Sequence, residues 1–245
     1  LHTAYRRQRQ MCIRDSMLTG GSEATVNEIG IAGFAALTAL STETDPTEAS
    51  KPFDKNRHGF VLGEGSGILV IESLEHAQAR GANILAELVG YGASSDAYHM
   101  TSPSPDGEGA ARAINDALRD ASLEPNQISY INAHGTATGA NDSGEAHAIA
   151  TVFGENTVPV SSTKGMTGHL LGAAGAIEAL ISVGAIDRGQ LPVNVGVDEQ
   201  DDDTKVVNLV TKATQNQAPE YVMSANYGFG GHNAVIIFKK WYEEA

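Results

Sequence analysis

The chain has 245 residues, 41% of them hydrophobic and 19% charged, a composition that is typical of a folded α/β protein and excludes a disordered one. Its formal net charge of −14 argues against nucleic acid or an anionic membrane as the main partner, and no apolar run is long enough to span a bilayer. The single cysteine excludes a disulfide framework and predicts a cytoplasmic protein.

Residues 1–16 form an N-terminal tail that differs from the rest of the chain. The tail holds four of the sixteen Lys and Arg residues, shows no hydrophobic period and stops where Met17 begins a β-type run. Its end, MCIRDS, is what the bases ATG TGT ATA AGA GAC AGC encode, and it resembles a transposase sequencing adapter read as protein. We therefore predict that the tail is not native; the alternative is a basic N-terminal arm. No strand–turn–helix context activates Cys12 within it, so Cys12 is not expected to be a nucleophile.

The segment from residue 17 to 83 is expected to contain two helices and several short strands. The expected elements are a strand from Met17, a helix capped by Asn27 and running to Leu40, paired strands at 60–62 and 67–71 around a glycine hairpin at 63–67, and a helix at 74–80 ended by Gly81. The glycine segment follows a strand but opens no helix, so it is not a dinucleotide-binding fingerprint.

The segment from residue 84 to 245 is expected to alternate strands and helices. The expected strands are 84–91, 128–133, 158–162, 205–210, 221–224 and 234–239, and the expected helices are 108–122, 142–153 and 170–188, with a long loop at 92–107. This alternation predicts a largely buried sheet with parallel pairs. We predict a pseudo-repeat of two α/β halves, with residues 17–83 ending an incomplete first half and residues 84–245 forming the second.

Two histidines follow predicted strands in similar glycine- and threonine-rich turns. His134 follows the strand at 128–133, and His169 follows the strand at 158–162, with Lys164 five residues before it. Ligand sites in α/β folds form at the carboxyl ends of strands, and imidazole handles protons near neutral pH. The two loops together predict one acid/base and oxyanion-stabilising site, whereas each alone could be a loop histidine satisfied by backbone groups. Their separation and the lack of nearby Cys or His at ligand spacing predict no metal site.

A third loop, NYGFGGHN at 226–233, places three glycines around Phe229. Glycines permit an unusual backbone path and leave the aromatic ring free to swing. Phe229 could therefore be a gate whose backbone N–H faces a developing oxyanion, or it could plug the core at a tight hairpin.

Four short motifs carry a resemblance to a known family. They are NAHGT at 132–136, STK at 162–164, TGHLLGAAG at 167–175 and GFGG at 228–231. Each resembles a signature loop of the elongating β-ketoacyl-acyl-carrier-protein synthases of fatty-acid synthesis, and the similarity runs from Met17 to about Lys240. It implies a thiolase-like fold, a five-layer sandwich of two α/β halves, here with the first half truncated.

The resemblance also implies a function. Family members form homodimers and perform a decarboxylative Claisen condensation of an acyl thioester with malonyl-acyl carrier protein, using no cofactor besides the carrier's phosphopantetheine. The implied roles are oxyanion stabilisation by His134 and His169, support by Lys164, a buried glutamate at Glu145, phosphopantetheine binding by Thr136 and Thr138, and gating by Phe229.

Several positions depart from the family pattern. His58 stands where Asp is usual, Tyr227 where Phe is usual and Gly139 where Pro is usual. The family's N-terminal portion, with its nucleophilic cysteine, is not in the sequence, so we expect a C-terminal fragment that is inactive as given. The alternatives are a non-catalytic partner similar to a chain-length factor, which lacks that cysteine, and the ketosynthase of a polyketide system. The presence of both histidines and Lys164 argues against the non-catalytic partner.

Overall fold

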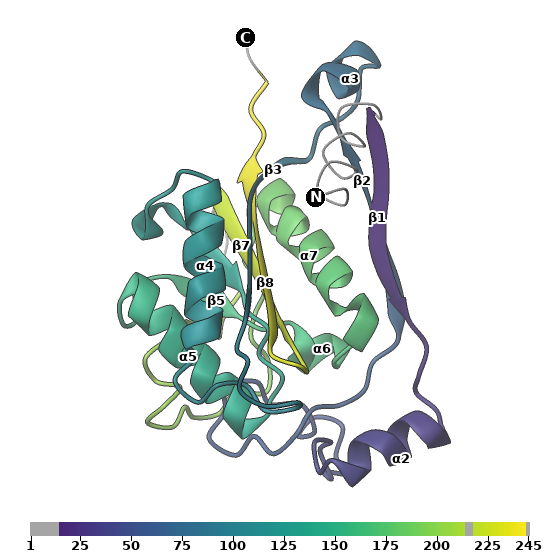
Figure 1. Ribbon diagram of the computed structural model, residues 1–245, viewed down its shortest axis with the longest axis vertical. Helices are drawn as coiled ribbons and strands as arrows, with labels where there is room; N and C mark the ends of the chain where they lie inside the picture. Colours follow the sequence, from purple (N-terminus) through teal and green to yellow (C-terminus); the bar gives the residue numbers. More distant parts are fainter. Residues whose placement is uncertain (1–14, 214–217, 244–245) are drawn as a thin grey trace.

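The computed structural model describes residues 15–213 and 218–243, so Cys12 and nearly all of the N-terminal tail lie outside the described residues. Figure 1 shows its helices and strands. They are β1 (Ser16–Glu23), α2 (Glu28–Ala36), β2 (Gly65–Glu72), α3 (Leu74–Ala79), β3 (Ala86–Ser95), α4 (Glu108–Asp120), β4 (Tyr130–Asn132), α5 (Gly139–Phe153), β5 (Pro159–Ser161), α6 (Lys164–Thr167), α7 (Ala174–Arg188), β6 (Asn208–Leu209), β7 (Tyr221–Gly228) and β8 (His232–Lys240). Single 3-10 turns lie at Pro125–Gln127 and Leu171–Ala173.

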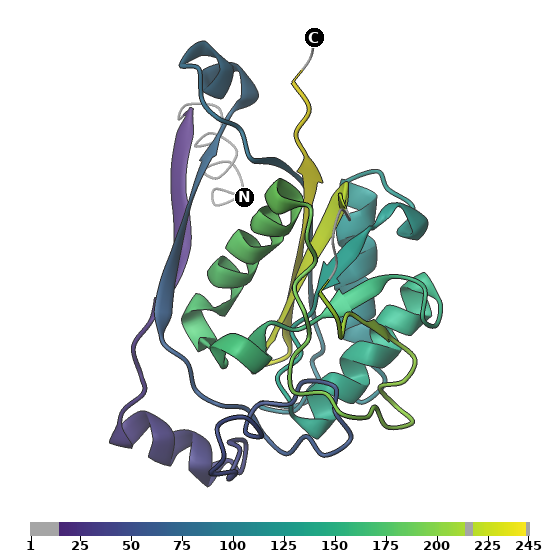
Figure 2. The same ribbon diagram turned by 180° about the vertical axis from the view of Figure 1, so that it is seen from behind.

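The centre of the molecule is a mixed six-stranded sheet with the strand order β3-β8-β7-β4-β5-β6. Strand β4 runs parallel to β5 and β7, and β8 runs antiparallel to β3 and β7. Helices α4 and α5 cover one face and α7 covers the other, as the two opposite views show (Figures 1 and 2). The predicted α/β class and the parallel pairs are confirmed.

Alternating side chains on the strands build a separate core on each face of the sheet. Met223 packs with the residues of α4 and α5, whereas its neighbour Val222 packs with those of α7. This is the two-residue period of a strand that is buried on both sides. Helix α4 buries an apolar stripe of Ala113, Ile114, Ala117 and Leu118. It lies so close to β3 that a Cβ on Gly92 would come within 2.0 Å of the Ala113 carbonyl oxygen.

A two-stranded antiparallel sheet of β1 and β2 forms a further layer beyond α7 (Figure 1). The predicted hairpin around residues 63–67 is therefore wrong, because Gly65–Glu72 pairs along its whole length with Ser16–Glu23. An eight-residue partner that is distant in sequence supplies more ladder hydrogen bonds than the three residues at 60–62 could. Strand β1 also begins at Ser16, one residue before the predicted start.

Several other predicted boundaries also differ from the structure. The helix capped by Asn27 ends at Ala36 rather than Leu40. The helix predicted over 170–188 begins at Ala174, after a short helix and a 3-10 turn that carry the His169 loop. Strands β7 and β8 extend into the predicted glycine loop and leave a turn at 229–231, where Gly230 and Gly231 have positive φ.

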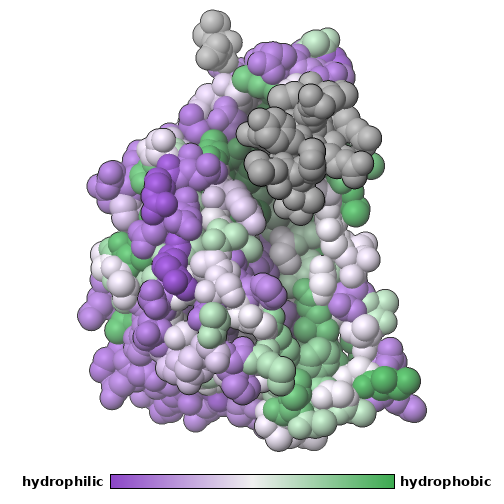
Figure 3. Space-filling model, viewed as in Figure 1, coloured by the Kyte–Doolittle hydropathy of each residue, from purple (hydrophilic) through white to green (hydrophobic). Residues whose placement is uncertain are grey.

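Large hydrophobic side chains are exposed on β1, β2 and α2. Leu18 is 74% exposed and Ile29 is 86% exposed, and Ile68 and Val70 also face solvent. Figure 3 shows hydrophobic residues gathered along this side of the molecule. Across residues 15–213 and 218–243, the structure contains no helix with the length and apolar character needed to cross a membrane.

Candidate active site

A cavity of about 860 Å³ opens at the carboxyl ends of the parallel strands β4 and β5. Five of the predicted site residues line it: His134, Thr136, Thr138, His169 and Phe229. The remaining two, Lys164 and Glu145, are buried behind the wall and contact His134. The structure thus brings all seven predicted residues to one place.

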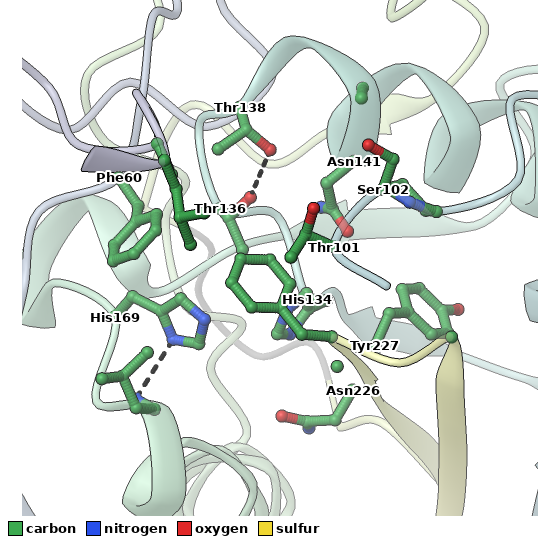
Figure 4. Close-up of a pocket in the computed structure, with 18 of the residues that line it drawn as sticks. Phe60, Thr101, Ser102, His134, Thr136, Thr138, Asn141, His169, Asn226 and Tyr227 are labelled. Atoms are coloured by element: carbon green, nitrogen blue, oxygen red, sulfur yellow. Dashed lines mark hydrogen bonds between the residues drawn. The ribbon is translucent and has the colours of Figure 1, made fainter. Parts of the chain in front are cut away.

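The two histidine rings meet edge to face in this cavity (Figure 4). Their centroids lie 5.2 Å apart with an interplanar angle of 85°. The Leu171 N–H donates to Nδ1 of His169 (3.3 Å), and Nζ of Lys164 lies 3.3 Å from Nδ1 of His134. Because Nδ1 accepts in each ring, the proton of each neutral imidazole belongs on Nε2. Both rings therefore carry an Nε2–H donor at this site.

The surroundings keep both imidazoles neutral. Burial lowers the pKa of His134 well below its usual value, and the nearby Lys164 and His169 lower it further. Burial and Lys164 lower the pKa of His169 to about 3. At neutral pH the two rings are thus uncharged hydrogen-bond donors.

A buried ion pair between Lys164 and Glu178 supports the His134 loop. Lys164 is 1% exposed, and its Nζ contacts a carboxylate oxygen of Glu178 on α7 and the carbonyl oxygen of His134. Burial raises the pKa of Glu178, while Lys164 opposes that shift. Glu178 was not predicted as a site residue, although the sequence carried a signal: it is the single acidic residue in the apolar stretch from 170 to 186.

Two carboxylates of helix α5 hold the backbone of the same loop. Glu145 accepts hydrogen bonds from the N–H groups of His134 (2.8 Å) and Gly135 (2.7 Å). Asp142 accepts from the N–H of Thr136 (2.9 Å). Burial raises the pKa of Glu145 to about 8, even though the two N–H donors act in the opposite direction. The loop after β4 is therefore fixed by side chains one and two turns into the following helix.

The threonines and Phe229 also line the cavity. The hydroxyls of Thr136 and Thr138 are 2.9 Å apart (Figure 4). Phe229 sits at the tip of the β7–β8 turn, 6.4 Å from the ring of Phe34 and 49% exposed. Phe229 therefore lies at the mouth of the cavity, and the alternative that it plugs the core is wrong.

Two further residues beside His134 were not assigned a role from the sequence. The ring of Tyr227 packs against His134 at 5.8 Å, and hydrogen bonding by the Asn226 side chain raises the pKa of His134 slightly against the effect of burial. Both residues line the cavity. Within the described part of the chain, no three His, Cys, Asp or Glu residues are grouped as metal ligands.

Models of two protein domains match the chain. The model described as "Beta-ketoacyl synthase, N-terminal domain" matches residues 3–77, and that described as "Beta-ketoacyl synthase, C-terminal domain" matches residues 85–198. The two matches are separated by residues 78–84.

Curated proteins are similar over nearly the whole chain. The chain is 51% identical over 229 residues to 3-oxoacyl-(acyl-carrier-protein) synthase 2 of Staphylococcus aureus (strain COL), covering 93% of this chain and 55% of that protein. It is 50% identical over 230 residues to the protein of the same name from Vibrio cholerae serotype O1, covering 92% of this chain and 56% of that protein. The chain thus spans about half the length of these relatives.

Solved structures share the fold. One is a type II PKS acyl-carrier protein in complex with its ketosynthase, with a TM-score of 0.91 and 38% identity over 96% of this chain and 59% of that one. Another is a beta-ketoacyl synthase from Burkholderia phymatum STM815, with a TM-score of 0.90 and 39% identity over 98% of this chain and 59% of that one. The predicted thiolase-like α/β fold is confirmed.

Proposed function

Because the chain belongs to the β-ketoacyl synthase family, we propose that it carries the oxyanion-stabilising part of a β-ketoacyl-acyl-carrier-protein synthase that elongates fatty acids. The observation that carries this proposal is the pair of neutral imidazoles, His134 and His169, which present Nε2–H donors to one cavity. The names of the relatives, which are 3-oxoacyl-acyl-carrier-protein synthases, support the same reaction class.

The first chemical step is decarboxylation of a malonyl thioester. The bond between the methylene carbon and the carboxylate breaks, CO2 leaves, and the electron pair moves toward the thioester so that its oxygen gains negative charge. Nε2–H of His134 and of His169 donate to that oxygen. These hydrogen bonds strengthen as the charge develops, and each donor of this kind lowers the barrier by roughly 3 kcal/mol.

Neutral rings suit this step better than charged ones. A neutral imidazole donates a proton in a hydrogen bond without losing it, so the enolate carbon keeps its electron pair for the next reaction. The low pKa values of His134 and His169 keep both rings in this form over the working pH range. Lys164 holds Nδ1 of His134 from behind and so keeps its Nε2–H on the cavity side.

The second step joins two carbons. The carbanion left by decarboxylation attacks the carbonyl carbon of an acyl thioester, a new carbon–carbon bond forms, and the thiolate leaves. The acyl group requires a cysteine nucleophile, and none lies among the described residues, since Cys12 is the single cysteine of the sequence. In this proposal the nucleophile belongs to the portion of the relatives that this chain does not match.

The proposed partner is acyl carrier protein, with Thr136 and Thr138 contacting its phosphopantetheine arm and Phe229 acting as the gate. A solved ketosynthase of similar fold is bound to an acyl-carrier protein, which supports this partner. We further propose a cytoplasmic homodimer without a bound cofactor. Residues 1–16 remain a proposed non-native tail, and residues 17–83 and 84–245 the proposed parts of two halves.

Decarboxylation alone tests the proposal, because it needs the two donors but no nucleophile. The purified chain is incubated with malonyl-acyl carrier protein, and acetyl-acyl carrier protein is measured by mass spectrometry. We expect His134→Ala and His169→Ala each to lower the rate at least 100-fold, in line with loss of one oxyanion donor.

The matched control is His147→Ala, on the outer side of α5 beside Asp203, which should leave the rate unchanged. If all three variants decarboxylate at the rate of the unsubstituted chain, the assignment of the two histidines is wrong. If the unsubstituted chain folds but releases no CO2, the non-catalytic alternative, a partner similar to a chain-length factor, is favoured.

A further inference from the structure

The Tyr227 side chain has a polar end that the proposed reaction does not use. Its ring packs against His134 with the two planes at 69°. Figure 4 shows its hydroxyl turned away from both imidazoles. The hydroxyl oxygen is buried and has no hydrogen-bond partner among the residues that the structure describes. Because an unpaired buried hydroxyl costs about 1–3 kcal/mol, such an atom requires an explanation.

A second, small cavity adjoins Tyr227. Its volume is about 10 Å³, at the lower edge of the roughly 10–15 Å³ that one water molecule needs. It is walled by the loop after β3, by helices α4 and α5, and by the β7–β8 hairpin. The polar residues that line it are Asp96, Ser104, Asn141, Glu145, Tyr227 and Asn233. Several polar side chains thus converge on a space just large enough for one water molecule, which needs two to four polar partners.

The two carboxylates of this small cavity both have acceptor capacity to spare. Oε1 of Glu145 accepts the His134 N–H, whereas Oε2 accepts the Gly135 N–H and, at 3.5 Å, Asn141 Nδ2. Since a carboxylate oxygen can accept two hydrogen bonds, Oε1 can take one more. Asp96 accepts from Asn233 Nδ2 (2.6 Å) on one oxygen and from the Ser104 N–H (3.1 Å) on the other. Both carboxylates raise the pKa of the Tyr227 hydroxyl in addition to burial, so the phenol keeps its proton and can donate it.

We propose that Tyr227 is a positioning residue whose hydroxyl donates to one water molecule in this small cavity, and that this water donates in turn to Glu145 and Asp96. The water then makes three hydrogen bonds, the usual number for a buried water. The bridge ties the carboxylate that holds the His134 backbone to the loop after β3, which also lines the large cavity.

The consequence of this bridge is that it helps to position the His134 ring. Glu145 holds the N–H groups of His134 and Gly135, so a group that fixes the Glu145 carboxylate also fixes the direction of the His134 ring. This role rests on the proposed function, because it concerns the alignment of an oxyanion donor. The existence of the bridge itself does not depend on that function.

The first test is a crystal structure of the unsubstituted chain at a resolution that shows ordered water. The proposal expects a water within hydrogen-bond distance of Tyr227 Oη and of both carboxylates. Absence of density for a water at Tyr227 Oη would overturn it. This outcome is independent of any activity, so it stands even if the protein releases no CO2 from malonyl thioesters.

The second test compares Tyr227→Phe with Tyr221→Phe, a partly buried tyrosine earlier on β7. In Tyr227→Phe the Glu145 carboxylate loses the hydrogen bond donated through the bridging water, so its pKa should rise above about 8. The pKa is measured by carbon-13 NMR of labelled glutamate. The Glu145 signal is assigned by its loss in Glu145→Gln. The other groups acting on Glu145 are Asp142 of α5, Lys164 of α6 and the backbone of the His134 loop, and both variants keep them.

In the decarboxylation assay, Tyr227→Phe should lower kcat about three- to tenfold with KM unchanged, as expected for one lost hydrogen bond that aligns a donor. Tyr221→Phe should change neither value. If the two variants give the same Glu145 titration, Tyr227 is merely a packing residue. If the unsubstituted chain shows no decarboxylation while the water and the titration shift are found, the proposed function fails and the bridge stands.

Discussion

The two histidine loops have the same proposed task but are held in different ways. The His134 loop is supported by buried ionisable side chains: Glu145 accepts its backbone N–H, and Lys164 contacts both its ring and its carbonyl oxygen. The His169 loop is supported by main chain. Its N–H donates to the Val61 carbonyl oxygen (2.7 Å), and its carbonyl oxygen accepts from the Gly63 N–H (3.0 Å).

The two loops should therefore respond to different kinds of substitution and to pH in different ways. Charged groups in a buried position are costly to desolvate and respond to pH, whereas backbone hydrogen bonds are insensitive to pH and to most side-chain changes. Loss of a charged partner should therefore destabilise the His134 loop most, whereas distortion of the backbone should destabilise the His169 loop most.

The largest expected effect comes from breaking the buried ion pair. Lys164→Ala leaves the Glu178 carboxyl buried without its partner, and the free energy of unfolding should fall by about 3–5 kcal/mol in urea titrations at pH 7. The control is Lys205→Ala, which breaks the solvent-exposed pair with Asp202 and should leave the free energy of unfolding nearly unchanged. A loss below 1 kcal/mol for Lys164→Ala would show that the pair does not support the loop.

The corresponding change on the His169 side is Gly168→Ala. Gly168 has a φ of +69°, and an added Cβ would lie 3.0 Å from the Val61 carbonyl oxygen. The expected loss is about 1–3 kcal/mol, and it should be the same at pH 5 and pH 9 because no titratable group is involved. Gly184→Ala on α7, where an added Cβ meets no atom within 4 Å, should be neutral or slightly stabilising. A loss that varied with pH would contradict the assignment to main chain.

The pH response of the His134 side should be visible in Glu145→Gln. Burial raises the pKa of Glu145 from its ordinary value of 4.5 to about 8 in the folded protein, so the folded state keeps a proton that the unfolded chain releases between these values. Stability contributed by this group is therefore lost as pH rises from 4.5 to about 8, with a slope of up to about 1.4 kcal/mol per pH unit. Replacing Glu145 should remove that slope from the unfolding free energy, whereas replacing the exposed Glu108 by Gln should leave it. An unchanged slope in Glu145→Gln would mean that other groups cause it.

The smallest expected effect is at the cavity mouth. Phe229→Ala removes a half-exposed ring, and the unfolding free energy should change by no more than about 0.5–1 kcal/mol. Phe60→Ala, which removes a buried ring packed against His169, should cost about 3–5 kcal/mol. A comparable loss in both variants would place Phe229 in the core rather than at the mouth.

Local patterns predicted much of this architecture. The stripe of Ala113, Ile114, Ala117 and Leu118 identified α4, and the positions of the two histidines after short strands placed them at one edge of the sheet. These features depend on residues close in sequence, where periodicity and turn chemistry are informative. The resemblance added Glu145, Lys164, Thr136 and Thr138, all of which the structure brings to the site.

The features that escaped prediction depend on contacts between distant residues. The pairing of β1 with β2 was missed because a strand's partner is chosen by the whole fold and not by the nearest β-type run. Glu178 was missed because its partner, Lys164, lies on a separate short helix. The unpaired hydroxyl of Tyr227 could be found only after its neighbours were placed.

The central claim is that His134 and His169 are both neutral and carry their protons on Nε2. Nitrogen-15 NMR of histidine-labelled protein at pH 7 tests it directly, with the two rings identified among the eight histidines by loss of signals in His134→Ala and His169→Ala. We expect both rings to show a protonated Nε2 and an unprotonated Nδ1 that stay unchanged down to pH 5. A cationic ring at pH 7, or a proton on Nδ1 of either ring, would contradict it.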